Sequence, residues 1–83
     1  MLKLGDLVEY VSDHGNGSVI QAKVKFIECC PIGSDEGMML PNAPLDLIRG
    51  GLKGKHFIIC FDNGKWAYGA HLVDKVYNLM GNA

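Results

Sequence analysis

The segment 57-FIICFDNGKWAYGAHLVDKV-76 contains two apolar runs separated by an Asp-Asn-Gly turn. Asn-Gly readily adopts the positive φ angles of a tight type I′ turn, so residues 55–61 and 65–68 are predicted to form a β-hairpin. Residues 69–71 suit a single turn of 3₁₀ helix, and the run 72-LVDKVY-77 suits a short final strand. This order of elements, a hairpin followed by a helical turn and a strand, indicates a small β-fold.

An earlier hairpin is predicted near the N-terminus. Apolar and polar residues alternate in 18-SVIQAKVKFIE-28, which is the period of a strand with one buried face. The short apolar run 7-LVEYV-11 precedes it, and the turn-rich segment 12-SDHGNGS-18 joins the two. The alternating side chains that we expect in the core are Ile20, Ala22, Val24 and Phe26.

A long segment, residues 29–54, separates the two hairpins and contains all three prolines. We expect an inserted loop with one helical turn near residues 44–49, because Pro44 suits a first turn and Gly50 suits a stop. Its apolar residues favour one of two roles: capping an open end of the fold, or forming a surface for a partner or a second copy. These residues are Met38, Met39, Leu40, Leu45, Leu47 and Ile48.

The composition indicates one folded domain that spans residues 1–83. Apolar residues make up 48% of the chain and charged residues 20%, which is ordinary for a globular protein and argues against disorder. The formal net charge is −1, whereas a strong nucleic-acid binder normally carries a basic excess. The net charge therefore disfavours a nucleic-acid-binding function but does not exclude it.

The cysteines and the apolar runs predict a cytoplasmic protein. The three cysteines include the adjacent pair Cys29-Cys30 and no framework of spaced pairs, which favours reduced thiols. The first residues, MLKLGDLVEYV, lack the continuous apolar core of a signal peptide. No run approaches the ~18 apolar residues of a membrane-spanning helix, so no membrane association is expected.

Five short strands with a 3₁₀ turn before the last resemble a small Src-homology-3-like or Tudor-like barrel. The resemblance is carried by 4-LGDLVEYV-11, 22-AKVKFI-27 and 57-FIICFDNGKWAYGAHLVDKV-76, about half of the chain. It implies an all-β class and a five-stranded barrel with residues 29–54 inserted. It also implies a binding module, and the size and style are similar to accessory proteins of bacteriophages or mobile elements.

Thiols and imidazoles do not form a catalytic or metal-binding pattern. Zinc sites usually take paired ligands from one tight turn, and adjacent Cys29-Cys30 would point to opposite faces of an extended chain. Cys60 and His56 share a strand face but lie about 13 Å apart along it, while His71 could return near the thiol. The apolar neighbours of Cys60 predict a buried, inert thiol. We therefore expect a protein that is not an enzyme, with no catalytic residue, metal or cofactor.

Aromatic and apolar residues favour a protein partner. Trp66 and Tyr68 share one face of the predicted strand 65–68, and Ala67 takes the other. If Ala67 packs inward, both aromatic side chains are exposed anchors for a partner; if not, both belong to the core. The predicted partner-binding residues are Trp66, Tyr68, Met38, Met39 and Leu40, and a homo-oligomer is a further expectation.

Lysines support two alternatives, a nucleic-acid-binding barrel or a small oligomer that sequesters an anionic, nucleotide-like ligand. Lysine side chains beside a stacking aromatic residue are typical of nucleic-acid surfaces. The segment 50-GGLKGK-55 has the composition of an anion site but lacks the spacing and following helix of a phosphate-binding loop. The residues in question are Lys23, Lys25, Lys53, Lys55 and Lys65.

Overall fold

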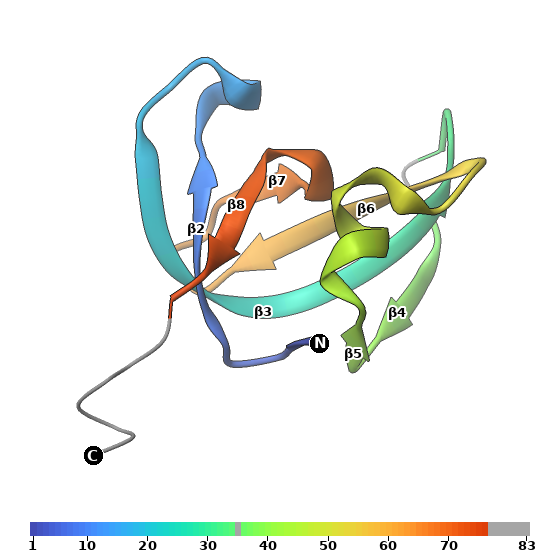
Figure 1. The fold of residues 1–83 in the computed structure, drawn as a ribbon, viewed down its shortest axis with the longest axis horizontal. Helices are drawn as coiled ribbons and strands as arrows, with labels where there is room; N and C mark the ends of the chain where they lie inside the picture. The colour runs from blue at the N-terminus through green and yellow to red at the C-terminus, as the bar shows by residue number, and fades with distance from the viewer. Residues whose placement is uncertain (35, 77–83) are drawn as a thin grey trace.

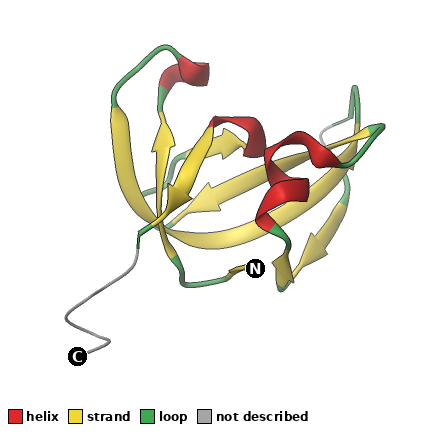
Figure 2. Cartoon of the chain, in the orientation of Figure 1, coloured by secondary structure: helices red, strands yellow, loops and turns green. Residues whose placement is uncertain are grey.

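The computed structural model describes residues 1–34 and 36–76, and these residues form a mainly β structure with short helical turns (Figures 1 and 2). The predicted all-β class is confirmed. The strands are β1 (Leu2–Lys3), β2 (Leu7–Val11), β3 (Val19–Pro31), β4 (Met38–Leu40), β5 (Asn42–Ala43), β6 (Lys55–Phe61), β7 (Trp66–Tyr68) and β8 (Leu72–Lys75). The helical turns are η1 (Asp13–Gly15), η2 (Leu47–Gly51) and η3 (Gly69–His71).

One sheet of six strands carries the fold. Its strands follow the order β7-β6-β3-β2-β8, β4 also pairs with β3, and every pairing is antiparallel. The long strand β3 curves across the molecule and serves both parts, pairing first with β2 and then with β6 and β4 (Figure 1). Across residues 1–34 and 36–76 no ladder joins β7 to β8, so a closed barrel is not formed by backbone pairing.

Both predicted hairpins are present, but the second one has a different turn. Gly64 has a φ of +80° while Asn63 does not enter the positive-φ region, so the two residues do not form a type I′ turn. The N–H of Gly64 donates to the carbonyl of Phe61, and the N–H of Phe61 donates to the carbonyl of Lys65. This is a three-residue loop with a left-handed glycine at its end. The predicted last strand ends at Lys75 as β8, and Tyr77 lies outside the described residues.

A β-bulge in β3 overturns the prediction that Phe26 packs in the core. The register with β6 shifts between Val24 and Phe26, so β3 contains one extra residue there. Because successive strand residues face opposite sides, one extra residue exchanges the two faces. Phe26 is therefore 43% exposed, and Ile27 takes the core position with 0% exposure.

The core lies between the two halves of the folded sheet. The rings of Tyr10 and Phe61 stack with centroids 4.1 Å apart, which joins β2 to β6 across the interior. The hydroxyl of Tyr10 accepts a hydrogen bond from the Nδ2 atom of Asn63 at 3.2 Å, so its polar end is satisfied at the hairpin. The buried apolar residues are Leu2, Val8, Tyr10, Ala22, Val24, Ile27, Cys30, Ala43, Ile48, Phe57, Ile59, Phe61, Ala67 and Leu72.

Residues 29–54 are more ordered than the inserted loop that the sequence predicts. Strand β3 continues to Pro31, and β4, β5 and η2 follow within the segment (Figure 1). Ile48 is buried in the core, and Leu40, Leu45 and Leu47 pack against it, so this part of the segment covers the core. Met38 and Met39 are exposed.

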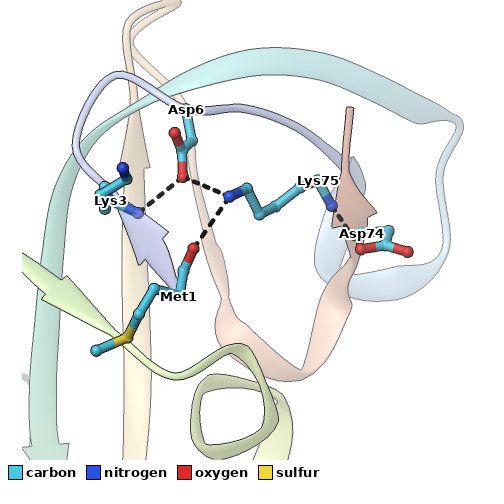
Figure 3. Close-up of polar contacts among 5 residues, drawn as sticks. All are labelled: Met1, Lys3, Asp6, Asp74 and Lys75. Carbon is cyan, nitrogen blue, oxygen red and sulfur yellow. Dashed lines mark hydrogen bonds and ion pairs between the residues drawn. The ribbon is translucent and has the colours of Figure 1, made fainter. Parts of the chain in front are cut away.

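A polar cluster ties the N-terminus to the last strand (Figure 3). The carboxylate of Asp6 accepts the backbone N–H of Lys3 at 2.9 Å and forms an ion pair with Lys75 at 3.3 Å. The Nζ atom of Lys75 also donates to the carbonyl of Met1 at 3.1 Å. Within the described part of the chain, no helix is long and apolar enough to cross a membrane.

Candidate functional site

Strand β7 presents its two large aromatic side chains outward. Ala67 pairs with Ile59 and is 6% exposed, so the Ala67 side of the strand faces the core. Side chains alternate along a strand, so Trp66 and Tyr68 project from the opposite side. Trp66 is 47% exposed and Tyr68 is partly exposed. Of the two arrangements that the sequence left open, the structure adopts the one in which Ala67 packs inward and the two aromatic side chains face outward.

The register of the sheet places further apolar side chains beside them. Cys60 pairs with Phe26 on one side and with Trp66 on the other. In the same way Ile58 pairs with Glu28 and Tyr68, and Met39 pairs with Glu28 from β4. Paired residues on adjacent strands share a sheet face, so these positions line one surface. We call this surface the outer face; its apolar members are Phe26, Met39, Ile58, Cys60, Trp66 and Tyr68.

A left-handed turn brings His14 onto the outer face. Asp13 and His14 have φ angles of +54° and +53°, a region that residues other than glycine rarely adopt. The His14 ring contacts the Trp66 ring edge-on at 5.6 Å and the Tyr68 ring at 6.3 Å. Gly15 lies so close to His71 that an added Cβ would stand 3.1 Å from its Nε2 atom. The turn therefore rests on His71 and holds His14 against the aromatic pair, and such strained backbone is concentrated at functional sites.

Two cavities meet at the contact between His14 and Trp66, which line both. One cavity of about 500 Å³ is largely apolar and is completed by Ile58, Cys60 and Tyr68. The other, of about 490 Å³, has polar groups from Ser12, Asp13, Lys65 and His71 in its lining. A bound molecule could therefore place an apolar group in the first cavity and a polar group in the second.

Cys60 does not lie in the core, contrary to the prediction. Phe57, Ile59 and Phe61 take the inward positions of β6, so the thiol between them faces the outer side. Partial burial raises the pKa of Cys60, nearby Glu28 raises it further, and Lys25 lowers it. The thiol is thus protonated at neutral pH, which makes it a poor nucleophile. Of the adjacent pair, Cys30 is fully buried.

Tyr68 is surrounded by imidazole rings. His56 and His71 lie edge-on to it at 5.6 and 6.1 Å, and the three residues line a further pocket together. The Nε2 atom of His56 and the Nδ1 atom of His71 are buried and have no hydrogen-bond partner among the described residues. No group of three or more His, Cys, Asp or Glu side chains among residues 1–34 and 36–76 has a geometry that could hold a metal ion.

The five lysines of the nucleic-acid and anion alternatives lie at two ends of β6. Lys23 exchanges hydrogen bonds with Asp62 after the end of β6, and Lys65 bonds to Phe61 through its carbonyl. Lys25 lies in the bulge at the same end, with its Nζ atom 5.6 Å from the Phe26 ring. Lys53 and Lys55 lie at the beginning of β6, about 20 Å away for a strand of this length. They do not form one continuous basic patch.

Some predicted partner-binding residues come together and others do not. Trp66, Tyr68 and Met39 belong to the outer face, whereas Leu40 pairs with Ile27 and packs against the core. Met38 is exposed at the edge of the sheet and lies opposite Cys29. The sequence analysis missed four contributors to the surface and its cavities. They are His14, Phe26, Ile58 and Cys60.

The alternation in 55-KHFIICF-61 could have identified Ile58 and Cys60, because Phe57, Ile59 and Phe61 already account for the core face. The position of His14 depends on the left-handed turn at Asp13 and His14, which no sequence pattern indicates. No protein-family model, curated protein or solved structure matches the chain.

Proposed function

We propose that the chain is a non-enzymatic interaction module that binds a protein partner on its outer face. The observation that carries this proposal is the burial of Ala67 beside an exposed Trp66 and a partly exposed Tyr68. Large aromatic side chains that stay accessible next to an apolar cavity are the usual anchors of protein interfaces. The strained turn at Asp13 and His14 supports the proposal, because it completes the cavity at a cost in backbone energy.

One element supports the Src-homology-3-like resemblance. The 3₁₀ turn η3 lies directly before the last strand, β8, and the resemblance rests in part on such a turn. In such folds the binding surface is formed by side chains and loops rather than by the fold itself, so the proposal depends on the outer face and not on the resemblance.

The alternative classes have weaker support. A nucleic-acid surface that uses all five lysines is disfavoured, because Lys53 and Lys55 lie at the far end of β6 from Lys65. Covalent catalysis at Cys60 is disfavoured, because its pKa is raised by burial and by Glu28. The segment 50–55 contains a left-handed Gly50 and Gly54 but begins no helix, so it does not resemble a phosphate cradle.

Substitution of Trp66 tests the proposal. The tagged chain, Trp66→Ala and Ile32→Ala would be compared in affinity capture from host lysate, with quantification of each retained protein by mass spectrometry. Ile32 is a matched control, because it is also an exposed apolar residue but lies outside the outer face. We expect at least one protein to be retained by the wild type and by Ile32→Ala and to be lost at least about tenfold with Trp66→Ala. An unchanged set of proteins with Trp66→Ala would refute the proposal.

A further inference from the structure

Two carboxylates near the outer face form hydrogen bonds within the chain, whereas two nearby lysines form no ion pair with the described carboxylates. The carboxylate of Glu28 accepts the N–H of Gly37 at 3.0 Å, and that of Asp62 accepts the N–H of Lys23 at 3.2 Å. In contrast, neither Lys25 nor Lys65 forms an ion pair with any carboxylate of residues 1–34 and 36–76. The neighbouring anions are therefore partly satisfied by the chain itself, while two cations are available to a partner.

The two cations border the most exposed aromatic residues of the surface. The Nζ atom of Lys25 lies 5.6 Å from the Phe26 ring, and Lys65 lines the polar cavity together with Trp66. Phe26 and Trp66 flank Cys60 from opposite sides, so they are about 10 Å apart, two strand spacings. An apolar row with a cation near each end results.

We infer that the partner segment is an acidic peptide with an apolar anchor residue. This inference rests on the proposed function and specifies its partner. The anchor side chain occupies the cavity lined by His14, Ile58 and Tyr68, which offers apolar walls and aromatic edges. Carboxylates of the peptide then lie near Lys25 and Lys65, where charge is complementary and no carboxylate of the described chain is paired with them.

A peptide fits this surface better than a polynucleotide does. Each nucleotide carries a backbone charge, and binding along a strand normally uses a series of cations. Here Asp13 and Asp62 stand near Lys65, Lys23 is hydrogen-bonded through its backbone to Asp62, and Lys53 and Lys55 are at the far end of β6. The formal net charge of the chain is −1. Two separated cations around an apolar cavity match a few carboxylates around one apolar side chain.

Selection from a random peptide library tests this inference while the natural partner is still unidentified. Displayed random 12-residue peptides would be selected against the immobilised full chain and against Trp66→Ala. They would also be selected against the charge reversal Lys25→Glu/Lys65→Glu and a matched control, Lys53→Glu/Lys55→Glu. We expect the wild type and the control to enrich Asp and Glu by roughly threefold over the starting library, next to an aliphatic or aromatic residue. The reversal at Lys25 and Lys65 should abolish this enrichment.

Selected peptides would then be synthesised and titrated while the fluorescence of Trp66 is followed, since Trp66 is the only tryptophan in the chain. We expect Kd to rise about tenfold for Lys25→Glu/Lys65→Glu and to rise with added salt. An oligothymidylate of 20 nucleotides, titrated in parallel, should bind more weakly than the selected peptides.

Each contrary result refutes a specific part of the proposal. Peptides that depend on Trp66 but show no acidic enrichment, or that bind the charge reversal equally well, refute the acidic partner and leave the interaction module standing. No enrichment beyond that of Trp66→Ala refutes both. Tighter binding of the oligothymidylate assigns the surface to nucleic acid instead. Light scattering tests for a second copy of the chain. If the mass doubles with concentration and Trp66→Ala returns it to the monomer value, the outer face binds another copy of the chain.

Discussion

The reactivity of Cys60 depends on two residues of opposite charge on β3. Glu28 and Lys25 both act on the thiol through space, Glu28 raising its pKa and Lys25 lowering it, in addition to the larger effect of burial. A raised pKa means that less thiolate is present at any pH below it, and alkylating reagents react with the thiolate. The electrostatics of the outer face can therefore be measured at Cys60 without a bound partner.

We predict that Glu28→Gln speeds the alkylation of Cys60 by about two- to fivefold at pH 8, and that Lys25→Gln slows it by a similar factor. Iodoacetamide labelling followed by peptide mass spectrometry measures the rate, with buried Cys30 as an unreactive internal reference. In the wild type, the midpoint of the rate against pH should lie above that of a free cysteine. Changes of the same sign for both substitutions, or a midpoint below that of free cysteine, would contradict the assignment.

At the scale of elements, the bulge in β3 decides which side chains reach the outer face. Before the bulge, the N–H and carbonyl of Val24 bond to Asp6 and Gly5; after it, the strand pairs residue by residue with β6. The extra residue lies where the strand changes partner. Without it, Phe26 would enter the core and the outer face would lose one end of its apolar row.

We predict that Ile27→Ala lowers the free energy of unfolding by about 2–4 kcal/mol, because it leaves a cavity in the core. Phe26→Ala should cost about 1 kcal/mol or less, because the ring is only partly buried on the outer face. Urea denaturation followed by circular dichroism gives both values. The opposite ranking would indicate that side chains alternate along β3 without interruption, and it would contradict the bulge between Val24 and Phe26.

A second contact between elements joins η2 to η3. Gly69 packs so closely on Ile48 that an added Cβ would overlap the Ile48 carbonyl oxygen. This contact fixes the segment that covers the core against the turn that leads into β8. It also sets the position of Tyr68, the residue before Gly69.

We predict that Gly69→Ala destabilises the fold by about 2–3 kcal/mol, since the backbone of one of the two turns must move. Ala70→Ser is the matched control in the same 3₁₀ turn, and its exposed side chain should change stability by less than about 0.5 kcal/mol. Thermal unfolding compares the two variants. Equal stability of both would show that η2 does not pack on η3 as described.

These elements also show what could be predicted from the sequence. Both hairpins and the 3₁₀ turn were predictable, because period-two patterns and Asn-Gly or glycine-rich turns are local properties. The exposure of Phe26 was not, since a bulge depends on pairing between segments distant in sequence. The outward position of Trp66 and Tyr68 was one of two equal alternatives, and the burial of Ala67 decided it. His14 was missed because its location requires positive φ angles at two residues other than glycine.

At the scale of the whole molecule, the ends of the described chain are held by side chains as well as by strands. Strand β1 pairs with β5, two residues from each, and β8 pairs with β2. Two-residue strands contribute little pairing by themselves, and a domain of this size buries a limited fraction of its surface. The Asp6–Lys75 ion pair, whose side chains are only 21% and 20% exposed, connects these two regions (Figure 3).

We predict a coupling of about 0.5–1 kcal/mol between Asp6 and Lys75 in a double-mutant cycle of Asp6→Asn and Lys75→Met. Asparagine retains an oxygen that can accept the N–H of Lys3, so the cycle isolates the charge. Because the pair is electrostatic, the coupling should fall toward zero in 1 M salt, whereas hydrophobic contributions would persist.

In the control cycle, Asp74 takes the place of Asp6 as the carboxylate that is mutated. Asp74 adjoins Lys75 in sequence but accepts its backbone N–H rather than its ammonium group. Asp74→Asn with Lys75→Met should show almost no coupling. Denaturant unfolding at low and high salt provides all the values. If the Asp74 cycle gives the same coupling as the Asp6 cycle, the effect comes from general charge near Lys75, and the ion pair does not hold the N-terminal segment to β8.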